Sequence, residues 1–136
     1  MPKPALTRPA ILLALTLAAT PAYAACPVGQ TPMLSVRLYF GLTENRKLIT
    51  DTAWEDFLAR TVTPRFPGGY TVTNAMGRWR DQKTNAIARE PSRIIEVDAP
   101  DTKELRDKAE EIRKTYTARF HQQSVGIVTM PVCGAF

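Results

Sequence analysis

Few residues in this chain are suited to holding a metal ion or a phosphate. Its 136 residues include one histidine, His121, and two cysteines, Cys26 and Cys133, and they form no cluster at zinc-ligand spacing. A glycine-rich phosphate loop is also missing, because Gly68-Gly69 is too short and precedes an expected strand. The sequence therefore predicts neither a metal nor a cofactor.

Two broader classes of function are also not indicated. Ser35, Ser92 and Ser124 have no general base at a telling spacing, so no hydrolase arrangement emerges. The 18 Lys and Arg residues are mixed with 13 Asp and Glu residues along the chain. Because the bases are not gathered into a tract, we expect no nucleic-acid binding.

The chain has one long apolar run, Ala10 to Ala19, and it is too short to span a bilayer. Lys3 and Arg8 precede it, and Tyr23-Ala24 completes a small-residue cleavage pattern. This order is typical of a bacterial secretory signal over residues 1–24. Cleavage after Ala24 leaves residues 25–136 as one domain, exported to the periplasm or secreted, and lowers the net charge from +5 to +3.

The position of Cys26 leaves an alternative open. Ala24-Ala25-Cys26 resembles a lipoprotein signal, in which Cys26 would carry a lipid anchor. Such signals usually have leucine three residues before the cysteine, where this chain has Tyr23. We therefore expect a soluble exported protein that begins at Ala25.

Four segments have the composition and period of strands. Residues 34–40 alternate strictly, with Leu34, Val36, Leu38 and Phe40 on one face. The other segments are 70–80, 87–98 and 124–132. Gly77 predicts a bulge or bend in the second strand. Pro91 predicts a break or kink in the third, with an edge, a bulge or a break in the stretch beside it.

Two segments have an apolar stripe at helical spacing. The first begins at Thr50 or Thr52 and stops before Pro64, and the second begins at Asp101 or Thr102. Their buried faces are expected to hold Trp54, Phe57, Leu58, Leu105, Ile112, Tyr116 and Phe120. Arg65 and His121 stand at the two helix ends, where each can cap the last carbonyl groups.

This order of elements, β-α-β-β-α-β, predicts an α+β protein of ferredoxin-like fold. Its usual form is a four-stranded antiparallel sheet with both helices on one face. In that fold the first and last strands are neighbours, so Cys133 comes close to Cys26. Since an oxidising compartment favours bridged cysteines, we expect a Cys26–Cys133 disulfide.

Several motifs are spread along the chain. They are RLYFGL at 37–42, W-x-x-F-L at 54–58, VTPRFPGGYTV at 62–72, GRWR at 77–80, REPS at 89–92 and QQSVGIVTMPVC at 122–133. With these motifs the chain resembles the domain of unknown function 3574 family, which consists of small exported bacterial proteins. The resemblance implies no activity that can be transferred.

The sheet face opposite the helices is the best place for a site. The alternation directs Arg37 and Tyr39 there, and the root of the hairpin around residues 78–90 lies next to it. Arginine offers a fork of donors to carboxylate or phosphate, and aromatic rings can flank a ligand. The candidates are Arg37, Tyr39, Trp79, Arg80, Arg89 and Glu90, although ordinary ion pairing would also explain the charged ones.

Two kinds of function fit these candidates. The first is a non-catalytic binding or interaction module whose open sheet face binds a small anionic ligand or a second copy of the chain. The apolar Ile94, expected on that face, favours a second copy. The alternative is a small periplasmic enzyme, with Tyr39 or Glu90 as acid–base and Arg37 or Arg89 holding an anion. RNA binding by the sheet is not expected, because the third strand, Arg93 to Asp98, lacks a stacking aromatic.

Overall fold

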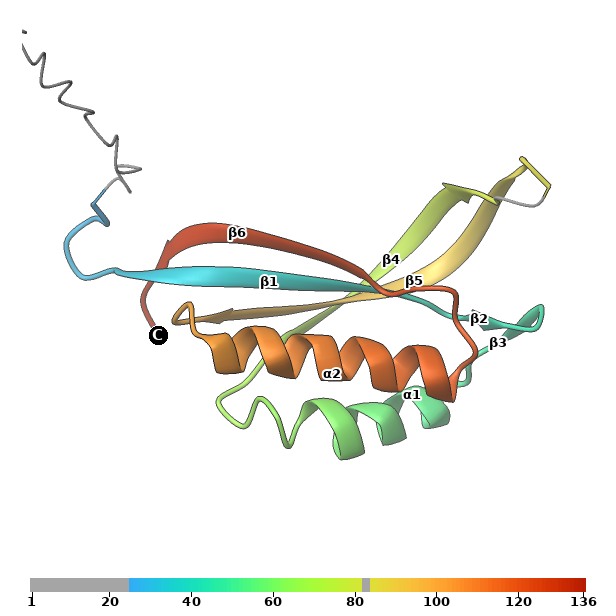
Figure 1. The fold of residues 1–136 in the computed structure, drawn as a ribbon, viewed down its shortest axis with the longest axis horizontal. Helices are drawn as coiled ribbons and strands as arrows, with labels where there is room; N and C mark the ends of the chain where they lie inside the picture. The colour runs from blue at the N-terminus through green and yellow to red at the C-terminus, as the bar shows by residue number, and fades with distance from the viewer. Residues whose placement is uncertain (1–24, 82–83) are drawn as a thin grey trace, which may run out of the picture.

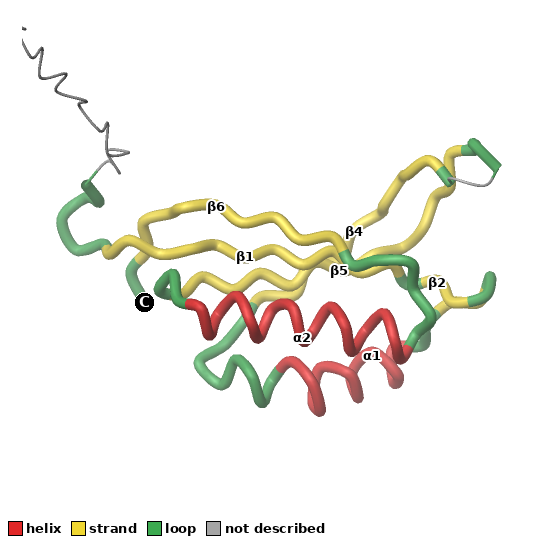
Figure 2. Tube along the Cα trace, viewed as in Figure 1, coloured by secondary structure: helices red, strands yellow, loops and turns green. Residues whose placement is uncertain are grey.

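The computed structural model describes residues 25–81 and 84–136, so the expected signal at 1–24 lies outside the described residues. Its main sheet is antiparallel, in the order β4-β5-β1-β6. Two helices lie against one face of this sheet (Figures 1 and 2). The elements are β1 (Thr31–Gly41), β2 (Thr43–Glu44), β3 (Lys47–Leu48), α1 (Asp51–Phe57), η1 (Leu58–Val62), β4 (Thr71–Arg80), β5 (Ile87–Ala99), α2 (Lys103–Arg119) and β6 (Gly126–Gly134). The predicted ferredoxin-like fold is confirmed.

The core lies between the sheet and the helices. Alternate residues of β1 point into it, and Phe40 packs edge-on against Trp54, Phe57 and Tyr116. Every side chain that was expected on the buried helix faces is buried. The period of the apolar residues was sufficient to predict this packing, because it reflects which face of each element meets the others.

Threonine hydroxyls start both helices. The Oγ1 of Thr50 accepts a hydrogen bond from the amide of Ala53, and that of Thr102 accepts one from the amide of Leu105. The first helix continues from α1 into the π-helical turn η1 and ends before Pro64. Arg65 caps its end as expected, since Nη1 donates to the carbonyl of Thr61 at 2.8 Å.

The structure contains a short hairpin, β2–β3, that the sequence pattern did not predict. Asn45 and Arg46 form its turn with φ of +47° and +66°. Asparagine tolerates this left-handed region but arginine rarely enters it, so the pair is a weak turn signal. His121 was expected to cap a helix carbonyl. Its ring contacts Glu44 of this hairpin instead.

No bulge or break is present at Gly77 or Pro91, but the edge expected beside Pro91 is found, because the ladder between β5 and β1 ends at Ser92. The register between β4 and β5 runs from Thr71↔Glu96 to Arg80↔Ile87 without a bulge or break. Proline is tolerated here because β1 ends beside it: Leu42 donates to the carbonyl of Pro91, and the carbonyl of Leu42 accepts from Ile49. The amide of Ile49, directly after β3, thus donates to the carbonyl of Leu42 the hydrogen bond that Pro91 cannot, because proline has no N–H.

A disulfide joins Cys26 to Cys133, with a Cα–Cα distance of 5.6 Å, as predicted. It connects the segment before β1 to the end of β6. Cys133 pairs with Pro32 in the antiparallel ladder between these strands. The bridge therefore secures an edge strand of the sheet at the end where the ladder stops.

Candidate functional site

The sheet face that carries no helix is here called the open face. Pairing across the strands places seven side chains in its centre: Ser35, Arg37, Tyr39, Ile94, Glu96, Val128 and Met130. The predicted orientation of Arg37 and Tyr39 is therefore correct. Figure 1 shows that the helices cover the other side of these strands and leave this side bare.

An ion pair occupies the middle of the open face. Arg37 Nη2 lies 2.9 Å from Glu96 Oε1, and the hydroxyl of Ser35 donates to the same oxygen at 3.2 Å. The hydrogen bond from Arg37 lowers the pKa of Glu96, and the same pairing raises the pKa of Arg37. An anion that approached Arg37 would have to compete with Glu96.

The neighbours of this pair on the open face are mixed, and the carboxyl group of Asp98 is among the charges that act on Arg37. Tyr39 packs across Gly126 of β6, where an added Cβ would lie 3.3 Å from the Cβ of the tyrosine. Tyr39 is 38% exposed and Val128 is 44% exposed, and Met130 is also exposed. The open face therefore combines exposed apolar side chains with an ion pair and a further carboxyl group, that of Asp98.

Glu90 lies on the same side of β5, near the end of β1, and is only 5% exposed. Its Oε1 accepts a hydrogen bond from the amide of Thr43, the first residue of β2. Gly41 makes room for it: a Cβ on Gly41 would stand 2.9 Å from Glu90 Oε2. Burial raises the pKa of Glu90, although the hydrogen bond from Thr43 opposes this effect.

The other candidates on the hairpin do not gather around Glu90. Trp79 is on the same side of the β4–β5 ribbon, and its ring folds back over Gly77. Arg89 stands opposite Arg78 in the ladder between β4 and β5. Because side chains alternate along β5, Arg89 lies on the other side of the ribbon from Glu90. Arg80 alternates with Trp79 and donates to the carbonyl of Asn85 at 2.9 Å. The six candidates thus divide between the two sides of the sheet.

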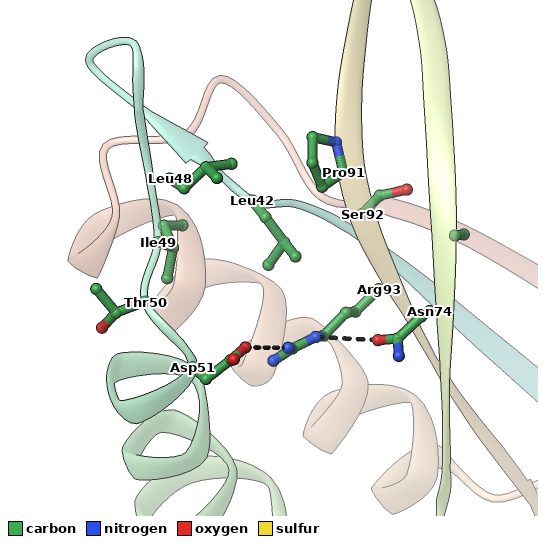
Figure 3. Close-up of a pocket in the computed structure, with 10 residues that line it drawn as sticks. Leu42, Leu48, Ile49, Thr50, Asp51, Asn74, Pro91, Ser92 and Arg93 are labelled. Atoms are coloured by element: carbon green, nitrogen blue, oxygen red, sulfur yellow. Dashed lines mark hydrogen bonds and ion pairs between the residues drawn. The ribbon is translucent and has the colours of Figure 1, made fainter.

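Two hollows lie elsewhere, and none of the six candidates lines either of them. One, of about 490 Å³, is beside the disulfide and is lined by Met33, Val132 and neighbouring residues. The other, of about 420 Å³, lies between the β2–β3 hairpin and the β4–β5 ribbon, and Arg93 closes one end (Figure 3). Sequence reasoning did not select Arg93, because its partner Asp51 is 42 residues away and no local pattern marks the pair.

Within the described ranges, no three His, Cys, Asp or Glu side chains are placed to hold a metal ion. None of the helices in the described part of the chain is both long and apolar enough to cross a membrane. The described residues thus offer three features: a sheet face without helices that carries exposed apolar side chains, the buried carboxyl group of Glu90, and two hollows away from the centre of that face.

The fold belongs to a class shared by proteins of diverse kinds. A phage SAM lyase in complex with S-methyl-5′-thioadenosine has a TM-score of 0.58 and 17% identity, covering 82% of this chain and 94% of the lyase. The apo form of a phage SAM lyase gives 0.57 and 16%, covering 85% and 97%. CutA from Synechococcus elongatus gives 0.51 and 13%, covering 78% and 83%. These likenesses show the fold alone.

Residues 35–136 match the family described as a protein of unknown function, DUF3574, and the chain belongs to that family. The resemblance carried by the sequence motifs is confirmed. Among curated proteins, none matches this chain significantly.

Proposed function

We propose that this protein is a non-catalytic interaction module whose open face binds a second copy of the chain. The observation that carries the proposal is the exposure of Tyr39, Val128 and Met130 on a sheet face without helices. Apolar side chains that gather on one exposed face are typical of a protein–protein interface.

Strand β6 is the element best suited to the contact. It forms an edge of the sheet, its residues 126–131 are exposed, and none of its nine residues is charged. Val128 and Met130 of this strand are exposed on the open face, so β6 adds apolar side chains to the contact. In a two-fold dimer each residue near the axis faces its own copy, so the absence of charge avoids like-charge repulsion. The other edge strand, β4, carries Arg78 and Arg80.

The alternatives that involve an anion receive less support from the geometry. Arg37 already pairs with Glu96, and Arg89 lies on the other side of the ribbon. Glu90 has the raised pKa that acid–base chemistry favours. However, it is almost fully buried and bonded to the amide of Thr43, which makes it a cap for the end of β1. A role for Tyr39 or Glu90 in catalysis stays a prediction.

The test is the mass of the disulfide-bonded chain of residues 25–136 in solution, measured by light scattering over a range of concentrations. We expect twice the mass of one chain for the wild type. Val128→Lys, which places two ammonium groups near the two-fold axis, should give a monomer that keeps its fold. Leu48→Lys is the matched control, since Leu48 is exposed on β3 away from the open face. It should leave the dimer intact.

A wild type that stays monomeric at every concentration contradicts the proposal. So does a dimer that survives Val128→Lys unchanged. Loss of the dimer in both variants would show that added charge acts without regard to position, and would also count against this interface.

We propose further that the chain is exported as one domain after cleavage behind Ala24. The Cys26–Cys133 disulfide supports an oxidising location. It also argues against a lipid anchor, because the sulfur of Cys26 cannot form both a disulfide and a thioether. Intact-mass spectrometry of the exported protein should give a chain that starts at Ala25 and is two hydrogen atoms lighter than the reduced form. A diacylglyceryl mass on Cys26 would contradict it.

A further inference from the structure

The hollow of about 420 Å³ beside the β2–β3 hairpin combines an apolar wall with a charged end (Figure 3). Its volume lies within the range of about 300–1,000 Å³ that is usual for sites of small molecules. It is called here the Arg93 groove. The groove is lined by Leu42, Leu48, Ile49, Thr50, Asp51, Asn74, Ala75, Pro91, Ser92 and Arg93.

The apolar wall comes from the chain that leaves β1 and returns to α1. Leu42 and Ile49 are buried; the amide of Ile49 donates to the carbonyl of Leu42, and the amide of Leu42 donates to the carbonyl of Pro91. Leu48 stands at the rim and is 64% exposed. This leucine packs little against its own chain, so an apolar group in the groove would remove it from water.

The charged end is a guanidinium group that is held in place from three sides. Arg93 Nε donates to Asn74 Oδ1 at 3.3 Å, Nη2 lies 2.5 Å from Asp51 Oδ1, and the group stacks on Trp54 at 5.0 Å from the ring centroid. The side chain of Arg93 is only 15% exposed. A fixed arginine of this kind is preorganised for a carboxylate.

The two partners in the Arg93–Asp51 ion pair differ sharply in burial. The Asp51 side chain is 88% exposed at the start of α1, whereas Arg93 is mostly buried. An ion pair with one partner in water contributes little, because solvent competes for the exposed charge. A ligand carboxylate can therefore replace Asp51 on Arg93 at low cost and bring an apolar tail with it.

We propose that the Arg93 groove binds a small monocarboxylate with a short aliphatic tail. The carboxylate takes the place of Asp51 on Arg93, and the tail lies against Leu42, Leu48 and Ile49. A single guanidinium beside an aspartate disfavours a dianion such as phosphate. The site shares no residue with the seven at the centre of the open face, so it does not depend on self-association.

The test uses hexanoate as the probe and amide chemical shifts of the folded, disulfide-bonded chain as the readout. We expect saturable shifts at residues that line the groove, weaker binding of acetate, which has no tail, and none of hexylamine, which has the opposite charge. The absence of saturable shifts with hexanoate overturns the proposal. Shifts confined to the open face around Val128 also overturn it.

Asp51→Asn is the decisive variant, because it removes the competing charge and keeps the size of the side chain. Hexanoate should bind about twofold to fivefold more tightly, the factor that corresponds to an exposed ion pair. Asp56→Asn is the matched control: Asp56 is on the same helix and pairs with Arg60 and Arg119, but does not line the groove. It should leave the affinity unchanged.

Leu48→Ser separates the tail from the carboxylate. This exposed substitution should weaken the binding of hexanoate and leave that of acetate as it is. If Asp51→Asn fails to tighten binding, or if Asp56→Asn tightens it equally, Arg93 and Asp51 are a structural ion pair and the proposal is wrong.

Discussion

The two faces of the main sheet are built from the same strands but differ in what covers them. On the helix side, Leu38 and Phe40 of β1 are almost completely buried under α1 and α2, whereas Tyr39 between them is 38% exposed. Alternation along a strand assigns each side chain to a face, but the covering layer decides whether that side chain leaves water. The open face thus leaves apolar side chains such as Tyr39 in contact with water, beside charged groups such as Arg37 and Glu96.

A second contrast lies within the open side itself. Glu90 and Glu96 are on the same strand and the same side of it, yet their pKa values shift in opposite directions. Burial raises the pKa of Glu90, and pairing with Arg37 lowers that of Glu96. The difference follows from burial at Glu90 and from a charged partner at Glu96, and not from the place of either residue in the pattern.

Truncation on the covered face should have the largest effect. Phe57→Ala removes a fully buried ring and should lower the free energy of unfolding by about 3–5 kcal/mol. Val128→Thr on the open face should change it by no more than about 0.5 kcal/mol. Urea denaturation measures both. Equal losses would erase the contrast between the faces.

Removal of the disulfide should come next. Replacing Cys26 and Cys133 together with serine should lower the free energy of unfolding by about 2–5 kcal/mol. Since β6 is an edge strand that pairs only with β1, its amides should lose hydrogen-exchange protection before those of β5. Unchanged protection in β6 would mean that packing, and not the bridge, holds this edge.

A hydroxyl group links the covered side to the end of β1. Tyr116 donates to the carbonyl of Gly41 at 2.6 Å, and burial strongly raises the pKa of its phenol. Tyr116→Phe should lower the free energy of unfolding by about 1 kcal/mol. Tyr70→Phe is the control, because its hydroxyl bonds to Thr63 at the exposed surface. It should have a smaller effect, and the reverse order would show that the Gly41 bond is unimportant.

The smallest effect should be a pH dependence of opposite sign at the two glutamates. The folded state raises the pKa of Glu90 above the ordinary 4.5. The free energy of unfolding therefore falls as the pH rises above 4.5 and Glu90 ionises. Glu90→Gln should therefore raise the melting temperature at neutral pH, with a gain that disappears below pH 4.5. The neutral amide still accepts the hydrogen bond from Thr43.

Glu96→Gln sharpens the comparison. The folded state lowers the pKa of Glu96, so its charge stabilises the protein above pH 4.5 and this contribution is lost as the pH falls. The variant should melt at a lower temperature than the wild type at neutral pH, with a loss that shrinks in acid. A shift of the same sign in both variants would refute the pKa assignments.

Local patterns predicted the covered side of this protein well. The period-two run of β1 and the apolar stripes of the helices encode burial directly, and neighbouring first and last strands made the cysteine pairing predictable. The candidate site was predicted less well. Its six residues had to be placed by the register of a hairpin, and a shift of one residue moves every side chain to the other side.

The amino-acid pattern by itself determined the order of the elements, the face that each apolar side chain takes, and the bond between Cys26 and Cys133. Only the tertiary structure decided that Pro91 is tolerated in β5 where its ladder with β1 ends, that Glu90 is buried against Gly41, and that Arg93 meets Asp51. The physical reason is that periodicity records the boundary between core and solvent, residue by residue. Contacts between distant segments depend on backbone paths, such as the β2–β3 turn, that leave only weak traces in composition.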